Sequence, residues 1–320
     1  MRVQISVIVE NTVWRAALLA EHGLAYWIRW GDQCVLFDTG QGMALTSNAY
    51  RLGIPLFEAT AVVLSHGHYD HTGGLADVLR NNNQARVFAH PAALQEKFAR
   101  LPDGGAKRIG FPDASLHCMR ERYHLWVKTD RPTVLGDGLR VTGPIPRVTD
   151  FEDTGGPFYL DQDCRRPDSL IDDQALFFET AQGTVVLLGC AHAGVINTLR
   201  YVLELTDHRP LYAVVGGMHL VHASTERMHR TLEELRRLNV QFLGPAHCTG
   251  RAATVMLSNA YADQILACHV GSQFEFELRS PHEADRPQAK RPVKESRMDK
   301  AEPSRAQEPT SQKGEEVKHV

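Results

Sequence analysis

The sequence predicts an α/β fold in which short buried strands alternate with amphipathic helices. Apolar residues make up 43% of the 320-residue chain, which is enough to bury a sizeable core. Short β-branched runs such as Val3–Val9 and Ala61–Leu64 predict strands, and apolar spacing over Thr225–Leu238 predicts a helix. Several of the apolar runs end in a histidine, where connecting loops commonly carry chemistry.

The N-terminal third is predicted to contain five strands. A hairpin is expected around Gly31-Asp32, because this pair suits a tight reversal. A proline in the first turn supports a helix that begins at Pro91. The expected strands are Val3–Val9, Leu24–Trp30, Gln33–Phe37, Ala61–Leu64 and Arg86–Ala89, and the expected helices are Met43–Leu52, Leu75–Leu79 and Pro91–Arg100.

The remainder of the chain divides into three parts. About 101–170 is rich in Pro, Gly and charge, and we expect short strands and long loops there, forming a cap-like insertion. Residues 281–320 have almost no apolar side chains, so we expect a disordered tail after a catalytic domain at 1–280. Between them we expect strands at Gln174–Glu179, Thr184–Leu188, Leu211–Val215, Val240–Leu243 and Gln273–Leu278, and helices at Val195–Leu205 and Thr225–Leu238.

Bulk properties narrow the class of protein. The formal net charge is −3, so the chain has no electrostatic footprint for nucleic acid or an anionic membrane surface. Six scattered cysteines without a CxxC pair indicate reduced thiols and a cytoplasmic location. The first 15 residues lack a signal-peptide apolar region, and no run is long enough to span a membrane, so we expect neither. The sequence does not predict the oligomeric state.

The most informative segment places four potential metal ligands within six residues. His66, His68, Asp70 and His71 follow directly after the predicted buried strand Ala61–Leu64. Neutral imidazole and carboxylate are standard donors for zinc. We expect His66 and His68 to face one ion, and Asp70 and His71 to face a second. Three further histidines, each after a later predicted strand, can complete the site: His192, His219 and His247.

The segments LFDTG, SHGHYDHTGGL, GCAHAG, GGMHL and PAHCTG resemble the metallo-β-lactamase superfamily. Within it they are similar to the branch of 7,8-dihydropterin-6-methyl-4-(β-D-ribofuranosyl)aminobenzene-5′-phosphate synthases. The resemblance covers about 1–280 and implies a four-layer αββα sandwich of two mixed sheets with helices outside. It also implies divalent metal, with two ions expected, zinc first and Mn²⁺ or Fe²⁺ as alternatives.

The resemblance assigns roles residue by residue. His66, His68 and His192 match the ligands of the first metal, and Asp70, His71 and His247 match those of the second. Asp70 would also position the attacking water, as the catalytic residue. Asp38 would orient a ligand histidine instead of binding metal.

Three residues have less certain roles in this pattern. Many members of the superfamily have a bridging Asp where this chain has Cys190, so the second site can be weaker or a thiolate can take part. His219 is open between metal ligand, substrate contact and support of a ligand. Asn11, which follows the first strand, is a candidate for binding substrate.

These residues lead to three hypotheses for function. The first is a metal-dependent hydrolase that acts on a small, anionic ester or phosphoester. The second is a synthase-like transferase that joins a dihydropterin to a ribofuranosylaminobenzene phosphate and displaces pyrophosphate. The third is a binding or sensor protein without catalysis. The expected partner is a small-molecule substrate in each enzymatic case.

Overall fold

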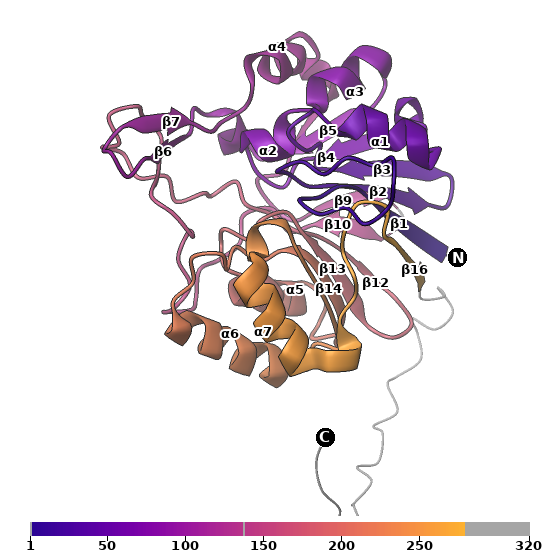
Figure 1. The fold of residues 1–320 in the computed structure, drawn as a ribbon. Helices are drawn as coiled ribbons and strands as arrows, with labels where there is room; N and C mark the ends of the chain where they lie inside the picture. The colour runs from indigo at the N-terminus through magenta and orange to yellow at the C-terminus, as the bar shows by residue number, and fades with distance from the viewer. Residues whose placement is uncertain (1, 137, 279–320) are drawn as a thin grey trace, which may run out of the picture. The chain divides into compact units, whose positions relative to one another are not determined.

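The structure is a computed structural model that describes residues 2–136 and 138–278. Two β-sheets face each other (Figure 1). The first has the strand order β16-β1-β2-β3-β4-β5-β8 and the second has the order β15-β14-β13-β12-β10-β9. The strands of the first sheet are β1 (Arg2–Val9), β2 (Ala25–Trp30), β3 (Gln33–Phe37), β4 (Ala61–Val63), β5 (Arg86–Ala89), β8 (Trp126–Lys128) and β16 (Gln273–Glu277). Those of the second are β9 (Thr133–Gly136), β10 (Leu139–Val141), β12 (Leu176–Glu179), β13 (Thr184–Leu188), β14 (Leu211–Gly217) and β15 (Phe242–Ala246).

Helices cover the outer face of each sheet (Figure 1). Over the first sheet lie α1 (Leu45–Leu52), α2 (Tyr69–Thr72), α3 (Leu75–Asn81) and α4 (Asp113–Glu121). Over the second lie α5 (Val195–Leu205), α6 (Thr225–Arg237) and α7 (Arg251–Tyr261). The expected four-layer αββα sandwich is therefore confirmed. No helix in the described part of the chain is long and apolar enough to cross a membrane.

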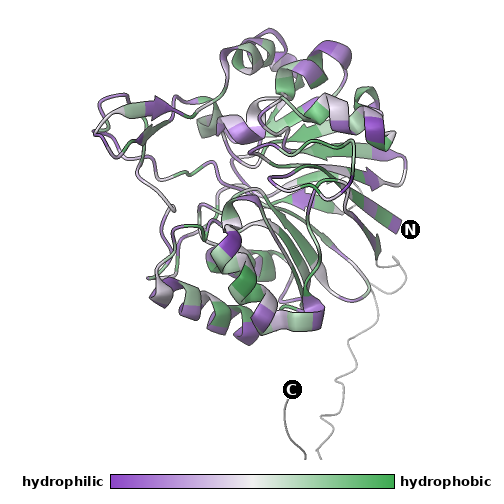
Figure 2. Cartoon of the chain, in the orientation of Figure 1, coloured by the Kyte–Doolittle hydropathy of each residue, from purple (hydrophilic) through white to green (hydrophobic). Residues whose placement is uncertain are grey.

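Three separate apolar cores hold these four layers together. In β13, Val185 and Leu187 point into the core between the sheets, while Val186 and Leu188 point into the core beneath α5–α7. A third core joins the helices α1, α3 and α4 to the first sheet. Both faces of each central strand are thus buried, which explains why the sequence reads there as continuous apolar runs. Figure 2 shows this hydrophobic interior between the more hydrophilic outer helices.

Three elements differ from the sequence prediction. The predicted helix Pro91–Arg100 is wrong: a 3-10 turn at Pro91–Leu94 is followed by strand β6 (Phe98–Arg100). The strand is favoured because β7 (Ala106–Arg108) and β11 (Phe158–Tyr159) pair with it on both sides. The strand predicted at Val240–Leu243 is displaced to Phe242–Ala246, because the edge of a sheet tolerates a proline within a strand. Helix α7 was not predicted.

The range 101–170, predicted as a cap-like insertion, is only partly separate from the sandwich. Strand β8 joins the first sheet, β9 and β10 join the second, and α4 packs on the core that it shares with α1, α3 and the first sheet. Only the small sheet β11-β6-β7 stands apart from the two main sheets, as an arm. The tail expected at 281–320 lies outside the described residues.

Candidate metal centre

The candidate site is built where strands from both sheets end. Strands β3, β4, β5 and β8 are parallel to one another, as are β13, β14 and β15. The carboxyl ends of parallel strands meet at one edge of a sheet, and ligand sites form there. At several of these ends a residue other than glycine has a left-handed backbone, which turns its neighbours toward the site: Asp38 (φ 60°), Ala191 (φ 54°), His219 (φ 45°) and His247 (φ 49°).

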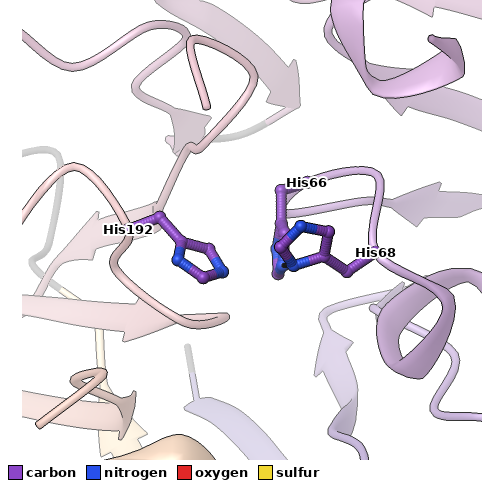
Figure 3. A group of neighbouring side chains, drawn as sticks. All are labelled: His66, His68 and His192. Atoms are coloured by element: carbon purple, nitrogen blue, oxygen red, sulfur yellow. Dashed lines mark hydrogen bonds between the residues drawn. The ribbon is translucent and has the colours of Figure 1, made fainter. Parts of the chain in front are cut away.

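His66, His68 and His192 form the first donor set. His66 and His68 come from the loop after β4, and His192 comes from the loop after β13, so the rings approach from opposite sides (Figure 3). His66 Nε2 lies 3.0 Å from His68 Nδ1. One nitrogen from each of the three rings lies within 4.8 Å of the others. All three side chains are buried.

Asp70, His71 and His247 form the second donor set. His247 Nε2 lies 3.3 Å from His71 Nε2 and 3.3 Å from Asp70 Oδ2. Asp70 Oδ2 lies 3.8 Å from His71 Nε2. The rings of His66 and His71 are in contact, tilted by 51° with 4.3 Å between their centroids, so the two donor sets adjoin. The structure therefore brings together all six residues that the sequence singled out as metal ligands.

Hydrogen bonds at the Nδ1 atoms determine the tautomer of four rings. His71 Nδ1 lies 2.7 Å from the Asp38 carboxylate, and His192 Nδ1 lies 2.8 Å from the carbonyl oxygen of Thr154. Both partners can only accept, so Nδ1 carries the proton and Nε2 keeps a lone pair directed at the centre. Metal ligands in proteins are commonly oriented in this way.

The other two rings are held in the same tautomer. Ser65 Oγ gives its proton to Asp38 (2.7 Å) and accepts from His66 Nδ1 (2.9 Å). Asn11 Oδ1 accepts from the Gly23 N–H and lies 2.8 Å from His247 Nδ1, which therefore donates. Asn11 also lines the cavity described below, so its position is compatible with the predicted substrate contact as well as with support of His247.

The histidines of the first donor set and His71 of the second have pKa values shifted in opposite directions. Burial is the main cause that lowers the pKa of His68 to about 3, and it lowers the pKa values of His66 and His192 well below their usual range. Burial also lowers the pKa of His71, but the carboxylates of Asp38 and Asp70 outweigh it and raise the pKa to about 9. The first set is thus neutral at pH 7, whereas the second attracts a cation.

The two open candidates, Cys190 and His219, also lie in the cluster. Cys190 Sγ is 3.1 Å from His71 Nε2. His219 contacts His192 in a tilted arrangement with 4.2 Å between ring centroids, and its Nδ1 is buried without a hydrogen-bond partner. One donor atom from each of Cys190, His192 and His219 lies within 4.8 Å of the others.

Three further residues were missed by sequence reasoning. His22 places Nε2 at 3.1 Å from Asp70 Oδ2. Phe158 of the arm contacts His68 and His192 at 5.2 and 5.3 Å between ring centroids. Lys97 is fully buried and pairs with Asp168 (2.7 Å) and Asp172 (2.9 Å). His22 lies close to a predicted strand, but no local signal identifies Phe158 or Lys97.

The donor sets open into a cavity of about 870 Å³. This volume lies within the range of sites for drug-sized ligands, about 300–1,000 Å³. Apolar and aromatic side chains make up much of its wall, and the lysine and arginine that line it are Lys107 and Arg251. Trp14, stacked on His269 at 4.5 Å, forms part of its rim.

The donor atoms fit a divalent cation. His192 Nε2 is buried without a hydrogen-bond partner, which is unfavourable unless another group binds there. Two nitrogen or oxygen donors on one tetrahedral zinc ion are roughly 3.3–3.6 Å apart, as follows from bond lengths of about 2.0–2.2 Å. The donor separations given above, 3.0, 3.3, 3.3 and 3.8 Å, range from slightly below to slightly above this spacing.

Residues 19–247 match the metallo-beta-lactamase superfamily. The chain belongs to this superfamily. Its members bind divalent metal, and the buried imidazole and carboxylate groups described above supply donors for it.

Individual relatives cover most of the superfamily domain. A 7,8-dihydropterin-6-methyl-4-(beta-D-ribofuranosyl)-aminobenzene-5'-phosphate synthase of Methanocaldococcus jannaschii is 28% identical over 268 residues, which cover 80% of this chain and 90% of the synthase. The protein MJ0448 of the same archaeon is 29% identical over an alignment that covers 83% of this chain and 98% of MJ0448. The crystal structure of Tm1679, described as a metal-dependent hydrolase of the beta-lactamase superfamily, aligns with a TM-score of 0.71 and 27% identity, over 86% of this chain and 99% of Tm1679.

Proposed function

We propose that this protein is a metal-dependent hydrolase that acts on a small, anionic ester or phosphoester. The observation that carries the proposal is the pair of adjoining donor sets, which open together into the cavity of about 870 Å³. His66, His68 and His192 would hold one cation, and Asp70, His71 and His247 would hold a second. Zinc suits these nitrogen and carboxylate donors, and Mn²⁺ or Fe²⁺ are alternatives.

A cation bound there would supply Lewis-acid chemistry, activating water and neutralising charge that develops on the substrate. Asp70, the proposed catalytic residue, lies at the cavity wall. Burial raises the pKa of its carboxyl group, but His71 and His22 outweigh burial and hold that pKa well below its usual range. His22 Nε2 donates to Asp70 Oδ2 and holds its orientation.

Residues of the arm and of α7 complete the proposed substrate site. Phe158 contacts the rings of His68 and His192, where it would limit the access of water. Lys107, on the arm, lies with its Nζ 5.2 Å from the centre of the Tyr69 ring, and Arg251 begins helix α7. Both cations line the cavity, where they would attract the anionic part of a substrate.

A second candidate function is transfer instead of hydrolysis. The similarity to the archaeal synthase over 80% of this chain favours it, as does a cavity with room for two substrate fragments. In that reaction an amine acceptor would displace pyrophosphate from a dihydropterin methyl diphosphate. The same donor sets would then hold the diphosphate.

One pair of measurements tests both candidates. We would determine bound zinc, manganese and iron in the purified protein, then assay a panel of phosphoesters and carboxylic esters with and without an aromatic amine. Two equivalents of metal and ester cleavage without amine support the hydrolase. Pyrophosphate release that requires the amine supports the transferase. Protein that binds no metal even after reconstitution contradicts both and favours a non-catalytic binding protein.

A further inference from the structure

The sulfur of Cys190 lies at the centre of the histidine cluster. It is 3.1 Å from His71 Nε2. It also belongs to three groups of donor atoms that lie within 4.8 Å of one another. Through these groups it is close to a ring nitrogen from each of five histidines: His66, His71, His192, His219 and His247.

A packing role does not explain this position. A buried free cysteine usually behaves as a small apolar side chain, surrounded by other apolar groups. Cys190 is 2% exposed, yet its sulfur faces imidazole nitrogens and the residue lines the cavity. The backbone just before Cys190 packs closely against the loop after β4, because a Cβ added at Gly189 would lie 2.0 Å from Ser65 Oγ. Only glycine allows the end of β13 to approach the loop after β4 so closely.

The sulfur of Cys190 lies beside two donors of the second set, His71 and His247. His71 Nε2 is 3.1 Å from Cys190 Sγ, 3.3 Å from His247 Nε2 and 3.8 Å from Asp70 Oδ2. Four donors on one tetrahedral zinc ion would be roughly 3.3–3.6 Å apart. Asp70, His71 and His247 supply three donors, and the sulfur supplies the fourth.

We propose that Cys190 binds the second metal ion through Sγ as a thiolate, which makes this a Cys-Asp-His-His site. The inference rests on the proposed metal-dependent function and specifies its second site. On binding, the S–H bond of Cys190 breaks, a metal–sulfur bond forms and the proton passes to solvent. A thiolate is a soft donor, so this site selects zinc, cobalt(II) or cadmium over manganese.

Cys248 provides a matched control within the same cluster. Its sulfur shares one donor group with Cys190 and His247, and it donates to the Cys190 carbonyl oxygen at 3.7 Å. It is buried next to a proposed ligand, as Cys190 is, and a serine has nearly the same size as either cysteine. The variants Cys190→Ser and Cys248→Ser therefore disturb packing to a similar extent but differ in the proposed metal–sulfur bond.

The experiment is a cobalt(II) titration of the metal-free protein, followed by absorption spectroscopy of wild type and both variants. We expect a sulfur-to-cobalt charge-transfer band in the near ultraviolet for wild type and Cys248→Ser. Cys190→Ser should lose that band but keep the visible cobalt bands of the first site. Cys190→Asp, which restores an anionic donor, should bind two equivalents without the ultraviolet band and should show an increased preference for manganese over cadmium.

Each other outcome overturns the proposal in a recognisable way. If wild type binds two cobalt ions without the ultraviolet band, the thiolate is excluded but the metal-dependent function stands. If the band disappears in Cys248→Ser instead, the sulfur ligand is Cys248 and not Cys190. If wild type binds no cobalt, both the thiolate and the proposed function fail. Should Cys190→Ser not fold, Cys190→Asp provides the same comparison.

Discussion

The two donor sets differ in the groups that hold their rings. In the first, His66 and His192 are held by a serine hydroxyl and a backbone carbonyl, and the rings stay neutral because burial lowers their pKa values. In the second, His71 is held by the buried carboxylate of Asp38, and Asp70 is itself a donor. The first set thus depends on shape and desolvation, whereas the second depends on negative charge.

The two sets therefore favour a cation for different reasons. In the first, the buried Nε2 atom of His192 has no hydrogen-bond partner, which is unfavourable unless another group binds there. In the second, Asp38 and Asp70 raise the pKa of His71 against the effect of burial, so this set favours positive charge. The following predictions test the comparison, from the largest expected effect to the smallest.

Replacing His68 with alanine should have the largest effect. The variant removes a donor of the first set, and the loss of a Lewis acid that contributes several kcal/mol lowers kcat/KM by about 10³-fold or more. Elemental analysis should show one equivalent of metal fewer than wild type. The exposed His124 provides a control, and His124→Ala should keep both metal and activity. Unchanged metal content in His68→Ala would contradict the assignment of the first set.

Lys97→Met should destabilise the fold by about 3–5 kcal/mol, because it leaves two buried carboxylates without their cation. Lys97 is fully buried, and Asp172 also accepts a hydrogen bond from the Gly67 N–H between the two histidines of the first set. Urea denaturation measures the change. In comparison, Arg80→Ala breaks an exposed ion pair with Asp77 and should change the stability by about 1 kcal/mol or less. Equal losses of stability in the two variants would show that the buried ion pairs of Lys97 stabilise the fold no more than the exposed pair of Arg80.

Asp38→Asn should weaken the second metal by about 10–100-fold, which is typical of losing a carboxylate that orients a ligand histidine. Competition with a chromophoric chelator measures the affinity of each site. The first metal should be affected less, although Ser65 also donates to Asp38. An effect confined to the first metal would reverse the comparison.

Asn11→Ala should have the smallest effect, a decrease of roughly tenfold or less in second-metal affinity, because a neutral hydrogen bond contributes about 1 kcal/mol. Asn11 Oδ1 accepts from His247 Nδ1 in the same way that Asp38 accepts from His71. Asn11→Asp keeps the acceptor and should bind the second metal at least as tightly as wild type. If Asn11→Ala leaves the metal unchanged but raises KM, Asn11 acts on substrate instead.

Sequence patterns located the histidine cluster because its ligands obey local rules. His66, His68, Asp70 and His71 lie within six residues after a buried strand, and His192 and His247 each come shortly after another strand. The apolar runs of β4 and β13 are buried on both faces, so they were recognisable without knowledge of the sheet. Asp38 was identified through its place after β3.

Tertiary structure alone decided which atoms meet. The strand β6 replaced a predicted helix because it pairs with β7, the next strand along the chain, and with β11, which is distant in sequence. Lys97 becomes a buried cation only through Asp168 and Asp172, more than 70 residues away. The sulfur of Cys190 enters the cluster because Gly189 lets two strand ends from different sheets approach. Local spacing therefore determined the ligands, while the distances and charges between them depend on long-range packing, which no short segment of sequence encodes.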